Sequence, residues 1–265
     1  TTPRPVRAAP GRFVWSVLMM MAALTLLSSV AAAGQAWQQR VWYEVFVRSF
    51  QDADGDGVGD LQGVIRRLPY LADLGVSGIW LMPSHPSPSY HGYDVTDYTD
   101  VNPEYGTLDD MRELLQAAHA LDIAVIIDFV PNHSSSRHPW FLAAAAGDPN
   151  YRDYYVWSEE PPDWRGVRGG SAWHPSPAGT GEYYLGLFSA GMPDLNHRNP
   201  AVIEEFKEIA RFWLDLGVDG FRVDAIQHMV ESDAGQISNT PETYEWVKGF
   251  EAFLHEEAPH AFLVG

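Results

Sequence analysis

An arginine and an aspartate two positions apart, Arg222 and Asp224, are the residues whose types and spacing most directly indicate chemistry in this chain. They lie in residues 219–228, DGFRVDAIQH, which read as a short buried strand and the turn after it. Alternate residues of a strand project from the same face, so both side chains point the same way. Because a guanidinium and a carboxylate are rarely buried unless paired, we expect each to bind the other or a nearby polar group. Spacing alone leaves two interpretations open, a structural salt bridge and an active site.

Polar side chains also follow two other predicted strands. The segment HGYDVTDY (91–98) comes after a strand at 78–82, and DFVPNH (128–133) ends a strand at 124–130. Parallel strands of a barrel bring their carboxyl ends to one rim, where such folds place their active sites. Any single histidine here could be a satisfied core or turn residue, but three strand ends together predict a site. The candidate residues are His91, Tyr93, Asp94, Asp128, His133, Arg222, Asp224 and His228.

Strands and helices alternate along most of the chain. The predicted strands are 41–47, 78–82, 124–130, 220–226 and 261–265, and the predicted helices are 61–74, 107–121, 201–217 and 242–257. The strand AVIIDFV is apolar on both faces, which is typical of parallel strands covered by helices. This pattern predicts an α/β fold, the N-terminal part of a (β/α)8 TIM barrel with about five of its eight strands.

Residues 132–200 interrupt this alternation with a segment rich in Pro, Gly, Trp and Tyr. The segment is far longer than an ordinary strand-to-helix loop, so it predicts a small inserted subdomain. The barrel would then run over residues 34–131 and continue over 201–265.

Residues 1–33 are typical of a signal peptide. Three arginines precede the apolar run of residues 13–30, and three alanines (31–33) follow it. We therefore expect a secreted or periplasmic protein with no membrane segment after cleavage. A retained membrane anchor is the alternative, because the run is nearly long enough to span a bilayer.

Composition excludes several classes of partner. The 265 residues carry a formal net charge of −18, with a pI near 4.7, which argues against nucleic acid or an anionic membrane as the ligand. The chain has no cysteine and therefore no disulfide or thiolate chemistry. Aromatic residues make up 13%, and their flat apolar faces suit carbohydrate rings. We expect a monomer that binds a neutral substrate.

The acidic segment DADGDGVGD (52–60) predicts a Ca²⁺ site. We expect Asp52, Asp54, Asp56 and Asp60 to bind the ion together with the backbone carbonyl of Val58. The spacing resembles an EF-hand loop, but residue 63 is a glycine where an EF-hand has a bidentate glutamate. The alternative is a solvated acidic turn, which close packing of like charges disfavours without a counter-ion.

Several motifs in the same order resemble the α-amylase family of glycoside hydrolases (family 13). They are HGYDVTDY, DFVPNH, MPDLN (192–196), GFRVDAIQH and FLVG (262–265), with further similar segments inside residues 132–200. The likeness covers everything from about residue 40 onward. The MPDLN variant resembles the group intermediate between the oligo-1,6-glucosidases and the neopullulanases.

The resemblance implies a role for each candidate residue. It implies that Asp224 is the catalytic nucleophile, that Arg222 holds it ionised and oriented, and that Asp128 supports the arginine. The implied sugar contacts are His91, Tyr93 and His133, with Asp94 beside them, and His228 on the acceptor side. Gln227 stands where a lysine often precedes that histidine, and Asn132 matches a position that binds a second calcium in many amylases.

The implied reaction is retaining hydrolysis of α-1,4-glucans such as starch and maltodextrins. The same family also offers an α-glucosidase, a cyclomaltodextrinase, a trehalose synthase-like enzyme and a non-catalytic sugar-binding homologue. It places the general acid, a glutamate, directly after an LVG such as that of residues 263–265. We therefore expect the 265 residues to be a fragment of a longer enzyme that is inactive by itself.

Overall fold

The computed structural model describes residues 37–265. The chain divides into two compact units, Thr1–Arg40 and Val41–Gly265. Of the first unit, the described part contains a helical turn at residues 37–39. The predicted signal peptide lies outside the described residues. Among the helices from residue 37 onward, none is long and apolar enough to cross a membrane.

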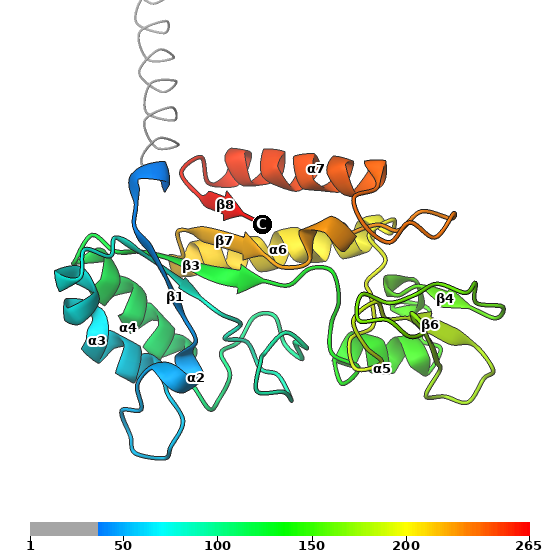
Figure 1. Cartoon of the computed structure of the whole chain (residues 1–265), viewed down its shortest axis with the longest axis horizontal. Coiled ribbons are helices and arrows are strands. Elements are labelled where there is room, and N and C mark those ends of the chain that lie inside the picture. The colour runs from blue at the N-terminus through cyan, green and yellow to red at the C-terminus, as the bar shows by residue number, and fades with distance from the viewer. Residues whose placement is uncertain (1–36) are drawn as a thin grey trace, which may run out of the picture. The chain divides into compact units, whose positions relative to one another are not determined.

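The second unit is built on a parallel sheet (Figure 1). Its strands are β1 (Trp42–Val45), β2 (Gly78–Leu81), β3 (Ala124–Phe129), β7 (Gly220–Val223) and β8 (Phe262–Val264). They are hydrogen-bonded in the order β1-β2-β3-β7-β8, and every neighbouring pair is parallel. The order in space equals the order in sequence, as the predicted barrel requires. The prediction of a parallel α/β fold is therefore confirmed.

The sheet is strongly curved. The rings of Trp42 on β1 and Phe262 on β8 stack with centroids 4.9 Å apart, although three strands lie between them in the sheet. Neighbouring strands are about 4.8 Å apart, so these two rings could not meet across a flat sheet. The two edge strands therefore face each other across the concave side, as the early strands of a barrel do.

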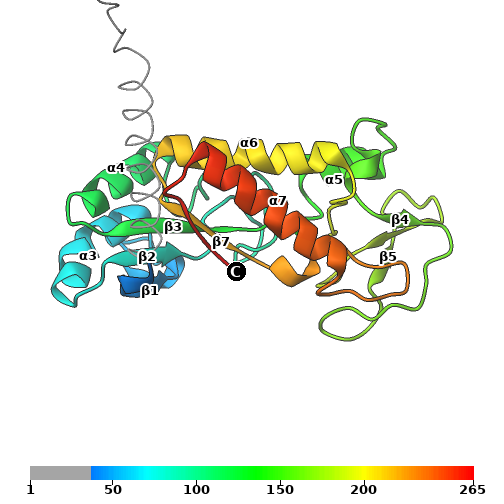
Figure 2. The same ribbon diagram turned by 90° about the horizontal axis from the view of Figure 1, so that it is seen from above.

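Helices follow β1, β2, β3 and β7 and pack against the sheet (Figures 1 and 2). They are α2 (Val47–Phe50), α3 (Leu61–Asp73), α4 (Leu108–His119), α6 (Pro200–Leu216) and α7 (Pro241–Glu257). Helix α4 starts at a capping box in which Thr107 and Asp110 bind each other's backbone N–H groups. Helices α6 and α7 both begin with a proline after a capping residue, Asn199 and Thr240, which fixes their first turns.

Most predicted elements lie within a few residues of the observed ones. The strand predicted over 220–226 ends at Val223, three residues early, and the first strand, predicted over 41–47, is also shorter. It ends at Val45, and Val47 begins the short helix α2 instead. Val47 is buried in the core from this helical turn, so its apolar character did not indicate strand.

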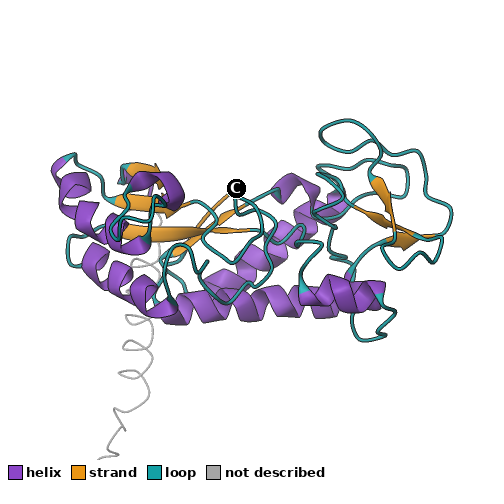
Figure 3. Ribbon diagram, turned by 90° about the horizontal axis from the view of Figure 1, so that it is seen from below, coloured by secondary structure: helices purple, strands orange, loops and turns teal. Residues whose placement is uncertain are grey.

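The inserted segment forms its own small sheet, seen apart from the parallel strands in Figure 3. It contains α5 (Pro139–Ala145), the 3₁₀ turn η1 (Arg152–Tyr154), β4 (Trp157–Ser158), β5 (Trp173–Pro175) and β6 (Tyr183–Leu185). The three strands are antiparallel in the order β4-β6-β5. The two ends of the insertion meet in an antiparallel bridge between His133 and Asp194, so the segment leaves and rejoins the sheet at the same place.

Gly220, at the start of β7, is predicted to be intolerant of a side chain. An added Cβ would lie 1.9 Å from the carbonyl oxygen of Phe262 on β8, and the backbone φ is +149°. We expect Gly220→Ala to lower the free energy of unfolding by about 2 kcal/mol or more through overpacking and strain. Urea denaturation of both proteins measures the difference.

Gly249, inside α7, gives a matched control because nothing lies within 4 Å of its added Cβ. There the same substitution should raise stability by about 0.5–1 kcal/mol through helix propensity. Equal effects at the two positions would contradict the close approach of β7 and β8.

Candidate active site

The candidate site is centred on the guanidinium of Arg222. Arg222 on β7 lies in register with Asp128 on β3. Its Nη1 donates to Oδ1 of Asp128 at 3.0 Å and to Oδ1 of Asp224 at 2.5 Å. One arginine therefore bridges two carboxylates from neighbouring strand ends, which is the pairing expected from the sequence.

Two aromatic side chains complete the contacts of Asp128. The indole Nε1 of Trp80 and the hydroxyl of Tyr93 both donate to its Oδ2, each at 3.2 Å. The guanidinium carbon of Arg222 lies 5.0 Å from the centroid of the Trp80 ring. Trp80 was not among the predicted site residues, because a tryptophan in an apolar strand is typical of the hydrophobic core. The available signal was its polar N–H, which needs a partner when buried.

Burial controls the protonation of this centre. Asp128 is 0% exposed, and this burial raises the pKa of its carboxyl group to about 7 even though Arg222 opposes the shift. Burial also disfavours the charge on Arg222, but Asp128 and Asp224 outweigh it and raise the pKa of the guanidinium. Arg222 therefore remains a cation at every physiological pH.

The turn after β7 directs Asp224 out of the sheet. The Asp224 N–H donates to the carbonyl of Phe129 at 2.8 Å, which keeps this residue tied to β3. The next residue, Ala225, has a left-handed backbone with φ 52° and ψ 24°, and the 3₁₀ turn η2 (Ile226–His228) follows. Such a conformation is costly for a residue with a side chain and is found mainly at functional sites. The Asp224 side chain keeps 18% of its surface exposed.

The loop after β2 holds His91 and Tyr93 in place. Oδ1 of Asp94 accepts hydrogen bonds from the hydroxyls of Ser87, at 2.7 Å, and Ser89. The Tyr93 N–H donates to Nδ1 of His91 at 3.1 Å, so a neutral His91 carries its proton on Nε2. The rings of His91 and Tyr93 stack with centroids 6.0 Å apart. Asp94 therefore positions the loop and does not itself line the cavity.

A chain of buried polar groups supports His133. Nδ1 of His133 lies 2.9 Å from Oδ1 of Asn132, whose Nδ2 donates to the carbonyl of His228 at 2.6 Å. Burial lowers the pKa of His133 to about 4, so the ring is neutral above that pH. Its Nε2 is buried without a hydrogen-bond partner among residues 37–265. The bond between Asn132 and His228 ties the loop after β3 to the turn after β7.

The ring of His228 is held by hydrogen bonds at both of its nitrogen atoms. Its Nδ1 donates to the carbonyl of Ile237 at 2.7 Å, and its Nε2 lies 3.0 Å from the amide nitrogen of Gln227. Both ring nitrogens are therefore engaged, and the residue is buried. The structure does not place His228 in the lining of the cavity.

A cavity of about 300 Å³ opens beside Asp224. It brings together segments from the β2 loop, the β3 loop, the insertion and the end of β7. Its lining residues are Tyr90, His91, Tyr93, His133, Arg168, Phe188, Met192 and Asp224. Four of these were missed by the sequence analysis. Phe188 and Met192 lie in recognisable motifs, whereas nothing in the sequence singled out Tyr90 or Arg168. A larger cavity of about 580 Å³ lies between α6 and α7, and neither Asp128 nor Asp224 lines it.

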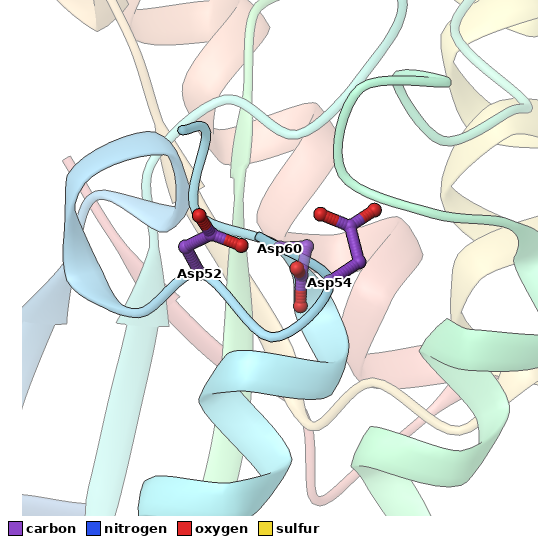
Figure 4. A group of neighbouring side chains, drawn as sticks. All are labelled: Asp52, Asp54 and Asp60. Carbon is purple, nitrogen blue, oxygen red and sulfur yellow. The ribbon is translucent and has the colours of Figure 1, made fainter. Parts of the chain in front are cut away.

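The acidic loop between α2 and α3 gathers part of the predicted calcium set (Figure 4). Oxygen atoms of Asp52, Asp54 and Asp60 lie within 4.8 Å of one another. The N–H groups of Gly55 and Gly57 donate to Asp52 and lower its pKa. These carboxylate donors fit a hard cation such as Ca²⁺.

Asp56 lies outside this cluster, whereas the carbonyl of Val58 stays a predicted ligand. Oδ1 of Asp56 accepts a hydrogen bond from the Val58 N–H at 2.7 Å. Asp60 also caps α3 by accepting from the Gly63 N–H at 2.6 Å.

The chain is similar to known proteins over nearly its whole described length. Residues 44–265 match the family model described as alpha amylase, catalytic domain. An alpha-amylase 3 of Dictyoglomus thermophilum is 45% identical over 252 residues, which are 94% of this chain and 48% of the relative. An oligo-1,6-glucosidase of Parageobacillus thermoglucosidasius is 42% identical over 235 residues, which are 86% of this chain and 42% of the relative.

Solved structures agree with these relatives. The crystal structure of an alpha-amylase from H. orenii has a TM-score of 0.77 and 49% sequence identity to this chain. The match covers 85% of this chain and 47% of that structure. The chain thus spans about half the length of the curated relatives that it matches.

The raised pKa of Asp128 predicts a pH-dependent stability. A carboxyl group whose pKa rises from 3.8 to about 7 on folding stabilises the fold fully below pH 3.8, and this contribution is lost as the pH rises through 7. The stability advantage of the natural protein over Asp128→Asn should therefore fall between about pH 4 and 7, by up to about 1.4 kcal/mol per pH unit. Urea denaturation across this range measures it.

Asp163→Asn is the control, because the Asp163 side chain is 89% exposed. Its stability difference from the natural protein should not vary with pH. A flat difference for Asp128→Asn as well would show that the buried carboxyl group has an ordinary pKa.

Proposed function

This chain belongs to the α-amylase family of glycoside hydrolases, and we propose that it carries the nucleophile side of an active site that hydrolyses α-1,4-glucans. Its sheet and insertion are the N-terminal part of the (β/α)8 barrel of that family. The observation that carries the proposal is the placement of Asp224, which is held by Arg222 and opens into a cavity of about 300 Å³. Starch and maltodextrins are the proposed substrates.

The chemistry that fits this placement is a retaining displacement. One oxygen of Asp224 attacks the anomeric carbon, the glycosidic C–O bond breaks, and the leaving oxygen takes a proton from a general acid. Water then cleaves the glycosyl ester and restores Asp224. Oδ1 of Asp224 accepts the bond from Arg222, so Oδ2 is the oxygen available for attack.

The register of the sheet supports the expected place of the general acid. Arg222 on β7 lies opposite Val264 on β8. The position two residues after Val264 would therefore lie beside Asp224, which is two residues after Arg222. A glutamate there, as the family resemblance implies, would have its carboxyl group on the same rim, and retaining enzymes need the two groups about 5 Å apart.

The other lining residues suit a sugar ring. Tyr93 and Phe188 offer flat apolar faces, and His91 Nε2 and His133 Nε2 offer polar edges. Burial, reinforced by Asp128 and Asp224, raises the pKa of Tyr93, so its hydroxyl stays protonated and continues to donate to Asp128. A neutral sugar ring with hydroxyls at its edge matches this combination of apolar and polar lining groups.

An α-glucosidase is the second candidate. A cavity of about 300 Å³ is near the lower limit for small-molecule sites and accommodates little more than one ring. One of the similar proteins is named an oligo-1,6-glucosidase. Ala225 after the nucleophile favours α-1,4 linkages, since a bulkier valine accompanies α-1,6 preference in the family. Product analysis on starch and on isomaltose distinguishes the two, and release of glucose alone from chain ends would favour the glucosidase.

We predict that Asp224 is the residue that becomes glycosylated. In the full-length enzyme, a mechanism-based fluoroglycoside should label the peptide containing Asp224, and Asp224→Asn should lower kcat by at least about 10³-fold because the nucleophile is lost. Mass spectrometry of the labelled protein and steady-state kinetics measure the two effects. A label on another carboxylate would overturn the assignment.

We also propose that Asp52, Asp54 and Asp60 bind one Ca²⁺. An ion that binds only the folded state stabilises it by mass action, by about 2.7 kcal/mol at a concentration of 100 Kd. EDTA should therefore lower the Tm, and added Ca²⁺ should restore it. Asp54→Asn should weaken this response without removing the cap of α3, which depends on Asp60.

Asp56→Asn is the matched control for the calcium prediction. Asp56 lies on the same loop but outside the cluster, so its substitution should leave most of the response to Ca²⁺. An unchanged Tm in EDTA for the natural protein would show that the loop is only an acidic turn.

Export is a separate proposal, supported by the basic start, apolar run and alanines of residues 1–33. We propose a secreted or periplasmic protein that acts as a monomer on polymers unable to enter the cell.

A further inference from the structure

Two side chains at the cavity beside Asp224 have no role in the chemistry derived above. Tyr90 comes from the loop after β2, and Arg168 comes from the inserted subdomain. Both line the cavity, and both are exposed, Tyr90 to 71%. They therefore lie at its mouth, where a part of a substrate that extends beyond the cavity would pass.

The backbone around Arg168 is fixed, whereas its side chain is free. Arg165 and Ser171 form an antiparallel bridge that closes a hairpin turn. Within the turn, the Gly169 N–H donates to the Gly166 carbonyl at 2.9 Å, and the Val167 N–H donates to the Leu187 carbonyl at 2.8 Å. In the described part of the chain, the Arg168 guanidinium has no hydrogen bond or ion pair, although the protein carries a net charge of −18. An unpaired guanidinium held at a cavity mouth is available to a ligand.

Tyr90 presents an aromatic face at the same mouth. Its ring meets His91 edge-on, with centroids 5.5 Å apart and an angle of 76° between the planes. That contact orients Tyr90 from one side and leaves most of the ring in solvent. Large aromatic side chains are usually buried, and an exposed one beside a cavity offers a stacking surface.

We propose that Tyr90 and Arg168 bind the sugar ring next to the one held over Asp224. The cavity accommodates little more than one ring, so the neighbouring ring of an oligosaccharide must lie over its mouth. Tyr90 stacks on the apolar face of that ring, and the guanidinium of Arg168 donates to its hydroxyls. Because Asp224 lines the same cavity and the protein is strongly acidic, the ring is neutral and not anionic. This inference rests on the proposed glycosidase activity.

Two substrates distinguish binding of the neighbouring ring from binding of the ring over Asp224. α-Glucosyl fluoride fills only the position over Asp224, because its leaving group is a single atom. Maltotriose carries neighbouring rings. In the full-length enzyme, Tyr90→Ala and Arg168→Ala should each lower kcat/KM for maltotriose by about tenfold or more, as loss of one stacking or charged hydrogen-bond contact does. Both variants should keep more of their activity on the fluoride, so that the ratio of maltotriose to fluoride activity falls by about tenfold.

Conservative and neighbouring substitutions provide the controls. Tyr90→Phe keeps the stacking face and should retain activity on maltotriose. Arg165→Ala removes a 72% exposed arginine of the same hairpin that does not line the cavity, and Tyr70→Ala removes a 54% exposed tyrosine on α3. Neither should change the ratio of the two activities.

Three outcomes would contradict either the proposed binding position or the glycosidase function on which it rests. An unchanged ratio of maltotriose to fluoride activity in both Ala variants would overturn the proposal. A loss confined to a phosphorylated disaccharide in Arg168→Ala would also overturn it and assign the arginine to an anionic substituent. Natural enzyme that is inactive on both the fluoride and maltotriose would instead overturn the proposed glycosidase function.

Discussion

The bridging of two carboxylates by Arg222 is the interaction on which the rest of the site depends. A buried carboxylate such as Asp128 is costly unless it is paired and hydrogen-bonded. Arg222, Trp80 and Tyr93 provide those contacts. The same Nη1 of Arg222 also donates a hydrogen bond to Asp224. Removing the arginine would therefore leave Asp128 and Asp224 without the cation that they share. The register of β3 against β7 is what places these groups within hydrogen-bonding distance.

The inserted subdomain turns this charged centre into a cavity. Because the bridge between His133 and Asp194 joins its two ends, the segment leaves and returns at the rim that carries Asp224. Phe188, Met192 and Arg168 reach the cavity from it, while Asp128 and Arg222 come from the sheet. The sheet thus supplies the charged residues that hold Asp224, and the insertion supplies much of the surface of the cavity. Variation in the insertion can change substrate preference without disturbing the ion pairs.

Local patterns in the sequence predicted the five parallel strands, the four longer helices and a polar partner for Arg222, but not the elements within the insertion. Contacts between distant segments were not predictable in this way. Trp80 looked like core because its partner, Asp128, lies on another strand. Arg168 sits in a turn whose position depends on the folding of the whole insertion. His228 stays a predicted acceptor-side contact, and its hydrogen bonds to Ile237 and Gln227 could not be read from the sequence. The family resemblance supplied roles for His228 and Asp128 but none for Trp80 or Arg168, and only the structure could supply the surroundings of all four.

The acidic loop illustrates how one residue can serve the fold and a ligand together. Asp60 uses Oδ1 to cap α3, and its Oδ2 accepts the Ala53 N–H at 2.8 Å. It therefore fixes the start of the helix and closes the loop that carries Asp52 and Asp54. None of these aspartates lines the cavity at Asp224. An ion bound here would act through the stability of the connection between β1 and α3, because it is too far from the reacting atoms to contact them. Loss of the ion would then reduce activity only to the extent that the fold itself is lost.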